Sequence, residues 1–242
     1  MPLMLAKDRV KLSKRRGAKA VLEYRNQGYL TQALNNYLAR LGWSHGDQEI
    51  FSEDELIRFF TLEHATKSAG VYDEDKLLWL NGHYIKETPD ADLARLLTPF
   101  LAPLGIADPD AAYLTRVAGT LKARCRTLVE MADAARFYFQ APERYDEKGA
   151  EKFLGPAAAP LLKEITARLE ALASYSEEAL NHLFQDLAAV TGAKMVNLAQ
   201  PVRLALTGRT ASPGLYEIIS IIGKEETLAR LQRALAFTQA VA

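Results

Sequence analysis

Apolar residues recur at the spacing of an α-helix along most of this 242-residue chain, and no other feature constrains its fold as much. Side chains three and four positions apart share one face of a helix, so such a stripe marks the face that is buried. The clearest stripes are Ala33, Leu34, Tyr37, Leu38 and Leu41; Leu114, Val117, Leu121, Cys125 and Leu128; Leu161, Leu162, Ile165, Leu169 and Leu172; and Leu180, Leu183, Phe184, Leu187 and Val190. The second half shows no sustained two-residue alternation. The sequence therefore predicts an all-α protein.

Start and stop signals divide these stripes into separate helices. Ser52 followed by Glu55 makes a capping box, and residues 31–40 form a helix that ends before Gly42. Thr88 and Pro89 predict a helix start with proline in the first helical position. The further predicted N-caps are Asp73, Ser176 and Ser212, and the further predicted stops are Gly192 and Gly223.

Composition excludes several classes of protein. The chain has 30 basic and 30 acidic residues, so no overall charge favours a nucleic acid or a membrane surface. Its one cysteine, Cys125, excludes an internal disulfide framework and a cysteine zinc cluster, and it fits a reducing compartment. The four histidines lack metal-ligand spacing, so no metal site is predicted. No run of about 20 apolar residues and no signal peptide is evident, which predicts a cytoplasmic protein.

Searches for catalytic motifs give no complete active site. Residues 42–46 read GWSHG and match the G-x-S-x-G pattern of a serine nucleophile. That chemistry needs a strand before the turn and a helix after it, whereas here a helix precedes and a polar turn follows. We therefore interpret the segment as a turn that ends a helix. The sequence contains neither a Walker loop nor a G-x-G-x-x-G motif.

Donors suited to phosphates and bases gather in three segments. Residues 11–18 read KLSKRRGA and carry ammonium, hydroxyl and guanidinium groups beside a glycine. The second segment, TLKARCRTL, contains Lys122, Arg124 and Arg126. The third runs from Gln200 through Arg203 and Gly208 to Ser212, Pro213 and Gly214. Taken singly, each arginine is more simply explained as a solubilising surface charge than as a group that reads a base.

Four blocks, in order, carry a resemblance to a known family. They are KLSKRRGA, LNNYLARLGWSHGDQEIFS, LEHATKSAGVYDEDKLLWLNGHYI and AQPVRLALTGRTASPGLYEIISIIGKEETLARL. Over nearly all of its length the chain resembles the C-terminal half of a bacterial glutamyl-tRNA synthetase, a class I aminoacyl-tRNA synthetase. The helical stripes agree with the glutamyl enzyme, since the anticodon region of the glutaminyl enzyme resembles β-barrels.

The resemblance implies a role for the first segment and a division of the chain. KLSKRRGA corresponds to the KMSKS signature, so Lys11, Ser13 and Lys14 are expected to approach the ATP phosphates in a parent enzyme that uses ATP with Mg²⁺. Residues 1–19 would form this loop segment, and residues 20–88 a helical stem-contact domain at the inner corner of the tRNA. Residues 89–148 and 149–242 would form two helical anticodon-binding subdomains.

The same resemblance implies which residues meet the anticodon. Arg203 and Ser212 lie at positions similar to those that the family uses for anticodon bases. An arginine of an earlier helix reads the third base in enzymes that discriminate glutamate tRNA from glutamine tRNA. Arg124 and Arg126 are both candidates for this role, because the local register leaves both open.

The resemblance also implies partners and a departure from the family. The expected partners are tRNA-Glu, with ATP and glutamate in the full-length enzyme, and the expected state is a monomer. The nucleotide-binding fold with its HIGH motif has no counterpart here, so we expect a truncated chain that alone neither forms glutamyl-adenylate nor charges tRNA. Two alternatives stay open: a non-catalytic helical module that binds RNA or protein, and a fragment of a class I lysyl-tRNA synthetase.

Overall fold

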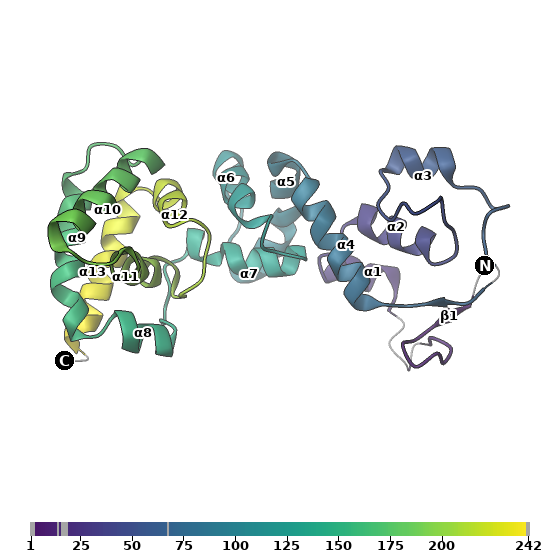
Figure 1. Ribbon diagram of the computed structural model, residues 1–242, viewed down its shortest axis with the longest axis horizontal. Helices are drawn as coiled ribbons and strands as arrows, with labels where there is room; N and C mark the ends of the chain where they lie inside the picture. The colour runs from purple at the N-terminus through teal and green to yellow at the C-terminus, as the bar shows by residue number, and fades with distance from the viewer. Residues whose placement is uncertain (1–2, 14, 16–18, 67, 241–242) are drawn as a thin grey trace. The chain divides into compact units, whose positions relative to one another are not determined.

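The computed structural model describes residues 3–13, 15, 19–66 and 68–240. The chain divides into two compact units, residues 1–134 and 135–242, and the boundary falls inside helix α7 (Leu128–Phe139). The helices of each unit are labelled in Figure 1. None of the helices in the described ranges is both long and apolar enough to cross a bilayer.

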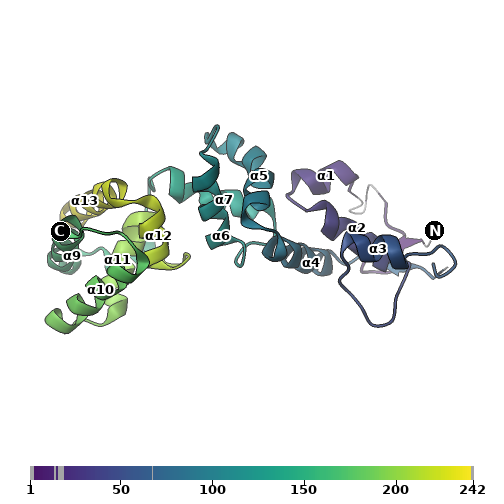
Figure 2. The same cartoon turned by 90° about the horizontal axis from the view of Figure 1, so that it is seen from above.

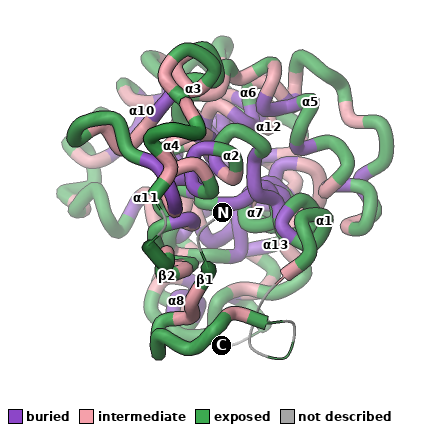
Figure 3. The backbone as a smooth tube through the Cα atoms, turned by 90° about the vertical axis from the view of Figure 1, so that its right-hand side faces the viewer, coloured by how far each residue is buried: buried purple, intermediate pink, exposed green. Residues whose placement is uncertain are grey.

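The first unit consists of short helices and one small sheet. Its helices are α1 (Val21–Asn26), α2 (Thr31–Arg40), α3 (Glu53–Phe59), α4 (Glu74–Glu87), α5 (Asp90–Leu101), the 3₁₀ turn η2 (Ala102–Leu104), α6 (Ala111–Leu121) and the start of α7. Strand β1 (Met4–Leu5) runs parallel to β2 (Gly70–Val71), with Met4 opposite Gly70, and Figure 3 shows the two strands side by side. This pairing joins the N-terminal segment to the residues that precede α4.

Two groups of apolar side chains organise the first unit. Tyr24, Tyr29 and Tyr37 pack with Leu77 and Leu80 of α4 in one buried cluster. Helices α5 and α6 form an antiparallel pair whose facing leucines are fully buried, and α7 lies against them in both ribbon views (Figures 1 and 2). Burial of these stripes supplies most of the stability of a helical domain.

The second unit is a helical bundle. Its helices are the end of α7, α8 (Glu147–Phe153), the 3₁₀ turn η3 (Pro156–Ala158), α9 (Ala159–Ala171), α10 (Glu177–Thr191), α11 (Met195–Thr207), α12 (Leu215–Ile222) and α13 (Lys224–Ala240). Helix α13 packs against α9 and α11, and α10 packs against α12 (Figure 2). The buried stripes of Leu162, Ile165 and Leu169 and of Leu180, Phe184 and Leu187 face this core.

An arginine lies in the core of the second unit. The side chain of Arg230 is 1% exposed and donates from Nε to Glu226 at 2.7 Å. Its Nη1 donates to the carbonyls of Phe137 at 2.6 Å and Leu206 at 2.7 Å. These carbonyls belong to the last turns of α7 and α11, where helical partners are missing. A cation there satisfies both acceptors and complements both helix dipoles.

The structure confirms the predicted all-α class, and the β structure among the described residues is limited to the two-residue strands and one isolated bridge. Ser52, Asp73 and Ser176 cap their helices with side-chain hydrogen bonds, as predicted, and Ser52 forms the full capping box with Glu55. The glycine stops at Gly192 and Gly223 are also confirmed.

Three local predictions were wrong. Pro89 is the N-cap residue of α5 and lies one position before the first helical residue, because its ψ of 141° is not helical. Thr88 before it is also extended, as expected for a residue that precedes proline. Ser212 does not cap α12, whose N-cap is Gly214. The stripe from Leu114 to Leu128 spans two helices, because α6 ends at Leu121 and α7 begins at Leu128.

Candidate nucleic-acid interface

The N-terminal basic segment is joined to β1 by backbone hydrogen bonds. Lys11 forms an antiparallel bridge with Leu5, and the Leu12 amide donates to the Met4 carbonyl at 2.9 Å. The side chains of Lys11 and Ser13 are exposed, so their donors can meet a ligand, whereas Lys14 lies outside the described residues. The predicted phosphate-binding segment is therefore attached to the small sheet at the start of α4.

Ion pairs hold both flanks of this segment on the first turn of α4. The Nζ of Lys7 lies 2.6 Å from Asp75, and that of Lys19 lies 2.5 Å from Glu74. The hydrogen bond and the charge of Asp75 raise the pKa of Lys7 above its ordinary value. The acidic residues are also favourable at a helix N-terminus, because the helix dipole is positive there.

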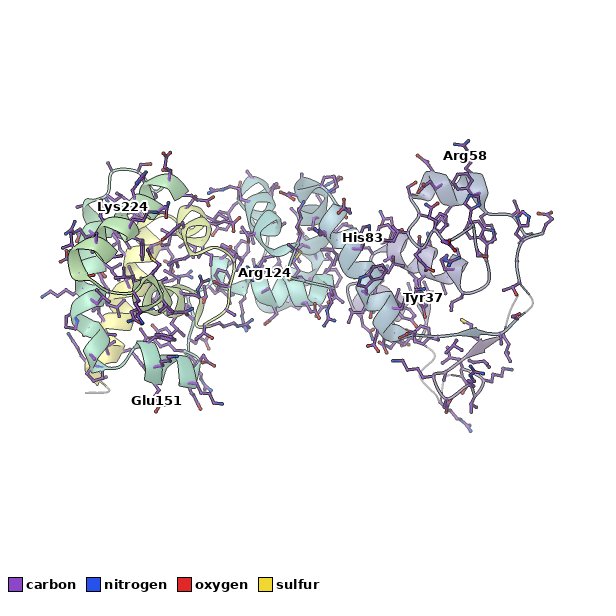
Figure 4. All side chains as sticks on the ribbon, viewed as in Figure 1. Tyr37, Arg58, His83, Arg124, Glu151 and Lys224 are labelled. Carbon is purple, nitrogen blue, oxygen red and sulfur yellow. The ribbon has the colours of Figure 1, made fainter. Side chains whose placement is uncertain are left out.

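The loop between α6 and α7 carries the candidate arginines Arg124 and Arg126, and both are exposed. Arg124 is labelled in Figure 4. The resemblance implied an arginine on a helix, but both residues follow the last turn of α6 because that helix ends at Leu121. Arg126 lies 4.0 Å from Glu130, and its backbone amide donates to the same carboxylate at 2.8 Å. Arg124 makes no ion pair with a described residue.

Two neighbours of these arginines have structural roles. The Nζ of Lys122 lies 2.7 Å from Asp90 at the start of α5, so this lysine links two helices. Cys125 is buried, and desolvation raises the pKa of its thiol to about 11. The interpretation of Cys125 as a core residue is confirmed.

A buried amide side chain holds the loop between α6 and α7 by a hydrogen bond to its backbone. Asn81 of α4 is fully buried, and its Nδ2 donates to the Arg126 carbonyl at 2.5 Å. Its Oδ1 accepts from the Leu30 amide at 2.8 Å. Sequence reasoning missed this role. Its only signal was an amide between the apolar residues of the predicted helix, since a buried amide must find hydrogen-bond partners.

In the second unit, Arg203 and Ser212 lie in direct contact. Arg203 projects from α11, and its Nη1 donates to the Ser212 hydroxyl and to the Pro213 carbonyl, the latter at 2.7 Å. Ser212 and Pro213 belong to the loop before α12, and both Arg203 and Ser212 are partly exposed. The structure therefore brings the two predicted anticodon residues together, nine positions apart in sequence, and holds the guanidinium in a fixed place.

Gly208 shapes the loop that follows Arg203. It ends α11 with a φ of +73°, and its carbonyl accepts from the Asp146 amide at 2.8 Å. A Cβ at this position would lie 2.8 Å from the Arg144 carbonyl oxygen. Only glycine satisfies both the left-handed backbone and this close approach.

Comparisons with known proteins agree with this arrangement. A family model described as an anticodon binding domain matches residues 92–235, which include Arg124, Arg126, Arg203 and Ser212. The chain belongs to this family. A second model, for the catalytic domain of class I tRNA synthetases of the E and Q type, matches residues 1–79. The residues matched by the anticodon-binding model thus follow a segment similar to part of a synthetase catalytic domain.

Individual relatives of this anticodon-binding chain are glutamate–tRNA ligases. The enzyme of Geobacter sulfurreducens is 48% identical over 99% of this chain and 51% of its own length. That of Syntrophobacter fumaroxidans is also 48% identical, over 98% of this chain and 51% of its own length. The chain spans about half the length of these curated relatives. The resemblance to half of a bacterial glutamyl-tRNA synthetase is confirmed.

Solved structures show the same relationship. A glutamate tRNA ligase from Elizabethkingia meningosepticum, crystallised in complex with its amino acid, superposes with a TM-score of 0.86 at 29% identity, over 97% of this chain and 50% of that chain. The synthetase of Elizabethkingia anophelis gives a TM-score of 0.81 at 28% identity, with the same coverage of both chains.

The described residues contain no group of three or more His, Cys, Asp or Glu side chains that could hold a metal ion.

Proposed function

We propose that this chain is the tRNA-binding portion of a glutamate–tRNA ligase, and that Arg203 and Ser212 meet bases of the anticodon of tRNA-Glu. The observation that carries the proposal is the contact between these two residues inside the region matched by the anticodon-binding model. A guanidinium held by Ser212 and Pro213 loses little conformational freedom when it donates to a base edge. Free arginines would lose more.

The exposed residues of the N-terminal segment fit the phosphates of a nucleotide. Lys11 and Ser13 offer an ammonium and a hydroxyl, and Lys14 would complete the KMSKS-type set. In the parent enzyme these donors would hold ATP and stabilise the negative charge that develops on the pyrophosphate. Mg²⁺ would then be bound through the ATP phosphates, since metal ions of this kind usually keep phosphate and water ligands.

The same proposal assigns a role to each segment of the chain. Residues 1–19 carry the ATP loop, residues 20–88 contact the inner corner of the tRNA, and residues 89–148 and 149–242 form the anticodon-binding subdomains. The full-length protein would act as a cytoplasmic monomer on glutamate, ATP and tRNA-Glu. The single cysteine supports a reducing compartment.

In this proposal the loop between α6 and α7 distinguishes glutamate tRNA from glutamine tRNA. The glutamate and glutamine anticodons differ at the third base, and both Arg124 and Arg126 are exposed on this loop. Arg126 shares its charge with Glu130, whereas Arg124 makes no ion pair with a described residue. Single alanine variants of the two arginines separate them: loss of preference for the glutamate anticodon identifies the reader.

The test of the proposal is the affinity of Arg203→Ala for tRNA-Glu across a salt series. If Arg203 reads a base, the variant loses about 1–3 kcal/mol of binding free energy, and the loss depends on the anticodon. The matched control is Arg168→Ala, which removes an exposed arginine of α9 that pairs with Glu164 in the same helix. Unchanged affinity and an unchanged salt slope for Arg203→Ala would overturn the assignment.

A further inference from the structure

A groove in the first unit has no role in the proposed recognition of the anticodon. It lies between the turn that joins α1 to α2 and the exposed side of α5, and its volume is about 680 Å³. Its polar and aromatic lining consists mainly of Arg25, Asn26, Tyr29, Gln32, Arg95 and Phe100. Ligand pockets have volumes of about 300–1,000 Å³, so the groove can hold a group the size of a nucleotide.

The charge of the lining favours an anion. The two ionisable groups that carry charge at neutral pH are Arg25 and Arg95, and no acidic residue lines the groove. Arg95 shares its charge with Asp92 on the same helix, whereas Arg25 is exposed and makes no ion pair with a described residue. Two other grooves differ from this one in that acidic residues line them. One contains Glu74 and Asp75, and the other contains three glutamates.

The remaining lining residues favour a planar ring. Phe100 is partly exposed and Leu96 is 42% exposed, so an aromatic face and an apolar edge are open to a ligand. The exposed amides of Asn26 and Gln32 can donate to and accept from a base edge. An aromatic platform beside a cation and amide groups is the combination that binds unpaired nucleotides.

The backbone on one side of the groove is rigid. The Leu128 amide donates to the Gly28 carbonyl at 2.9 Å, and Asn81 bonds to the Leu30 amide at 2.8 Å. Gly28 has a φ of +82°, and a Cβ there would lie 2.6 Å from the backbone nitrogens of Leu128 and Val129. The turn therefore packs directly on the start of α7, and Arg25, Asn26 and Gln32 flank a fixed support.

We propose that this groove binds one unpaired nucleotide of the RNA, with its base on Phe100 and its phosphate at Arg25. The inference rests on the proposed RNA-binding function but concerns residues of the first unit, whereas Arg203 and Ser212 belong to the second. It adds a contact that tolerates different bases, because every base presents a face for stacking.

The test measures the affinity of the full chain for a tRNA-Glu transcript, with Phe100 and Arg25 varied separately. Phe100→Leu keeps the apolar bulk without the ring and is expected to weaken binding about 5- to 150-fold, whereas Phe100→Tyr keeps the ring and the affinity. Arg25→Ala is expected to weaken binding and to lower the salt slope by about 1, a change that Phe100→Leu does not produce. Arg168→Ala, which removes an exposed arginine of α9 that pairs with Glu164, is again the control and should bind like the wild type.

Further arms identify the ligand. A titration with AMP tests whether a free nucleotide binds, and competition by polyglutamate tests for an acidic peptide. Saturable AMP binding that Phe100→Leu abolishes, without any effect of the groove variants on tRNA binding, would overturn the RNA assignment. Displacement of the tRNA transcript from the wild type and from the groove variants to an equal extent by polyglutamate would also overturn the RNA assignment. Thermal melting of each variant establishes that it is folded.

The outcomes separate this inference from the proposed function. If Arg203→Ala weakens tRNA binding while Phe100→Leu and Arg25→Ala do not, the groove inference is wrong and the anticodon proposal stands. If the groove variants weaken binding and Arg203→Ala does not, the anticodon assignment fails and the groove is supported. If the chain does not bind the transcript at all, both fail.

Discussion

Replacing the buried Arg230 with methionine should destabilise the second unit strongly. Methionine has similar length and fills the same space, but it has no hydrogen-bond donor. The substitution therefore leaves the carbonyls of Phe137 and Leu206 without the donor that now lies 2.6 Å and 2.7 Å away. Both acceptors are at helix ends, where the backbone supplies no replacement.

The magnitude follows from these two acceptors. Each buried polar group left without a partner costs about 1–3 kcal/mol, which gives about 2–6 kcal/mol for the pair. Loss of the ion pair to Glu226 adds at most about 1 kcal/mol, because that carboxylate is 43% exposed. Methionine also removes the desolvation cost of a buried guanidinium. The expected loss in the free energy of unfolding is therefore about 2–4 kcal/mol.

The assay is urea unfolding followed by far-UV circular dichroism. Tryptophan emission is unsuitable because Trp43 and Trp79 both lie in the first unit. The control is Arg233→Met on the same helix, since Arg233 is 55% exposed and lies 3.5 Å from the same Glu226. It should lose less than about 1 kcal/mol. If Arg230→Met is as stable as Arg233→Met, the two carbonyls are satisfied in another way and the reasoning is refuted.

Three further predictions concern pH, reactivity and backbone strain. A hydrogen bond from Arg40 is the largest of the causes that lower the pKa of Glu49 from 4.5 to about 2. The ionised Glu49 therefore stabilises the fold above pH 4.5, and this stabilisation is lost as the pH falls towards 2. In urea titrations Glu49→Gln should lower the free energy of unfolding by up to about 1 kcal/mol at about pH 7 and leave it unchanged near pH 2. Burial raises the pKa of Cys125 to about 11, so native protein should react with a disulfide reagent at pH 8 far more slowly than protein unfolded in urea, and equal rates would contradict its burial. Gly208→Ala should destabilise the chain in thermal melting by more than Gly192→Ala, which has a similar φ but no atom near its Cβ and should cost about 1–2 kcal/mol.

The sequence predicted the helices well because their signals are local. Apolar spacing identified the buried faces, and Ser52, Asp73 and Ser176 were found as caps because a cap bonds to amides two or three residues away. Where one stripe crossed a loop the prediction failed: Cys125 and Leu128 continue the spacing of α6, although the helix has ended. Periodicity alone cannot detect such a break.

The candidate site was only partly predictable from the sequence, because several of its contacts join residues that are far apart along the chain. The resemblance supplied Arg203 and Ser212, but the hydrogen bond between them depends on the loop before α12. Asn81 and Arg230 were missed because their partners lie 45 or more positions away along the chain, or belong to a different helix. A polar residue on an apolar face signals a long-range partner without indicating which one it is.

The most direct test of the central claim is the affinity of this chain for tRNA bearing the glutamate anticodon, compared with the same tRNA bearing the glutamine anticodon, over a range of salt concentrations. Our account predicts a preference for the glutamate anticodon that persists at physiological salt, because base contacts specify and phosphate contacts do not. Equal affinities that fall steeply with salt would mean that the chain meets only phosphates, and would contradict the assigned roles of Arg203, Ser212 and the loop arginines.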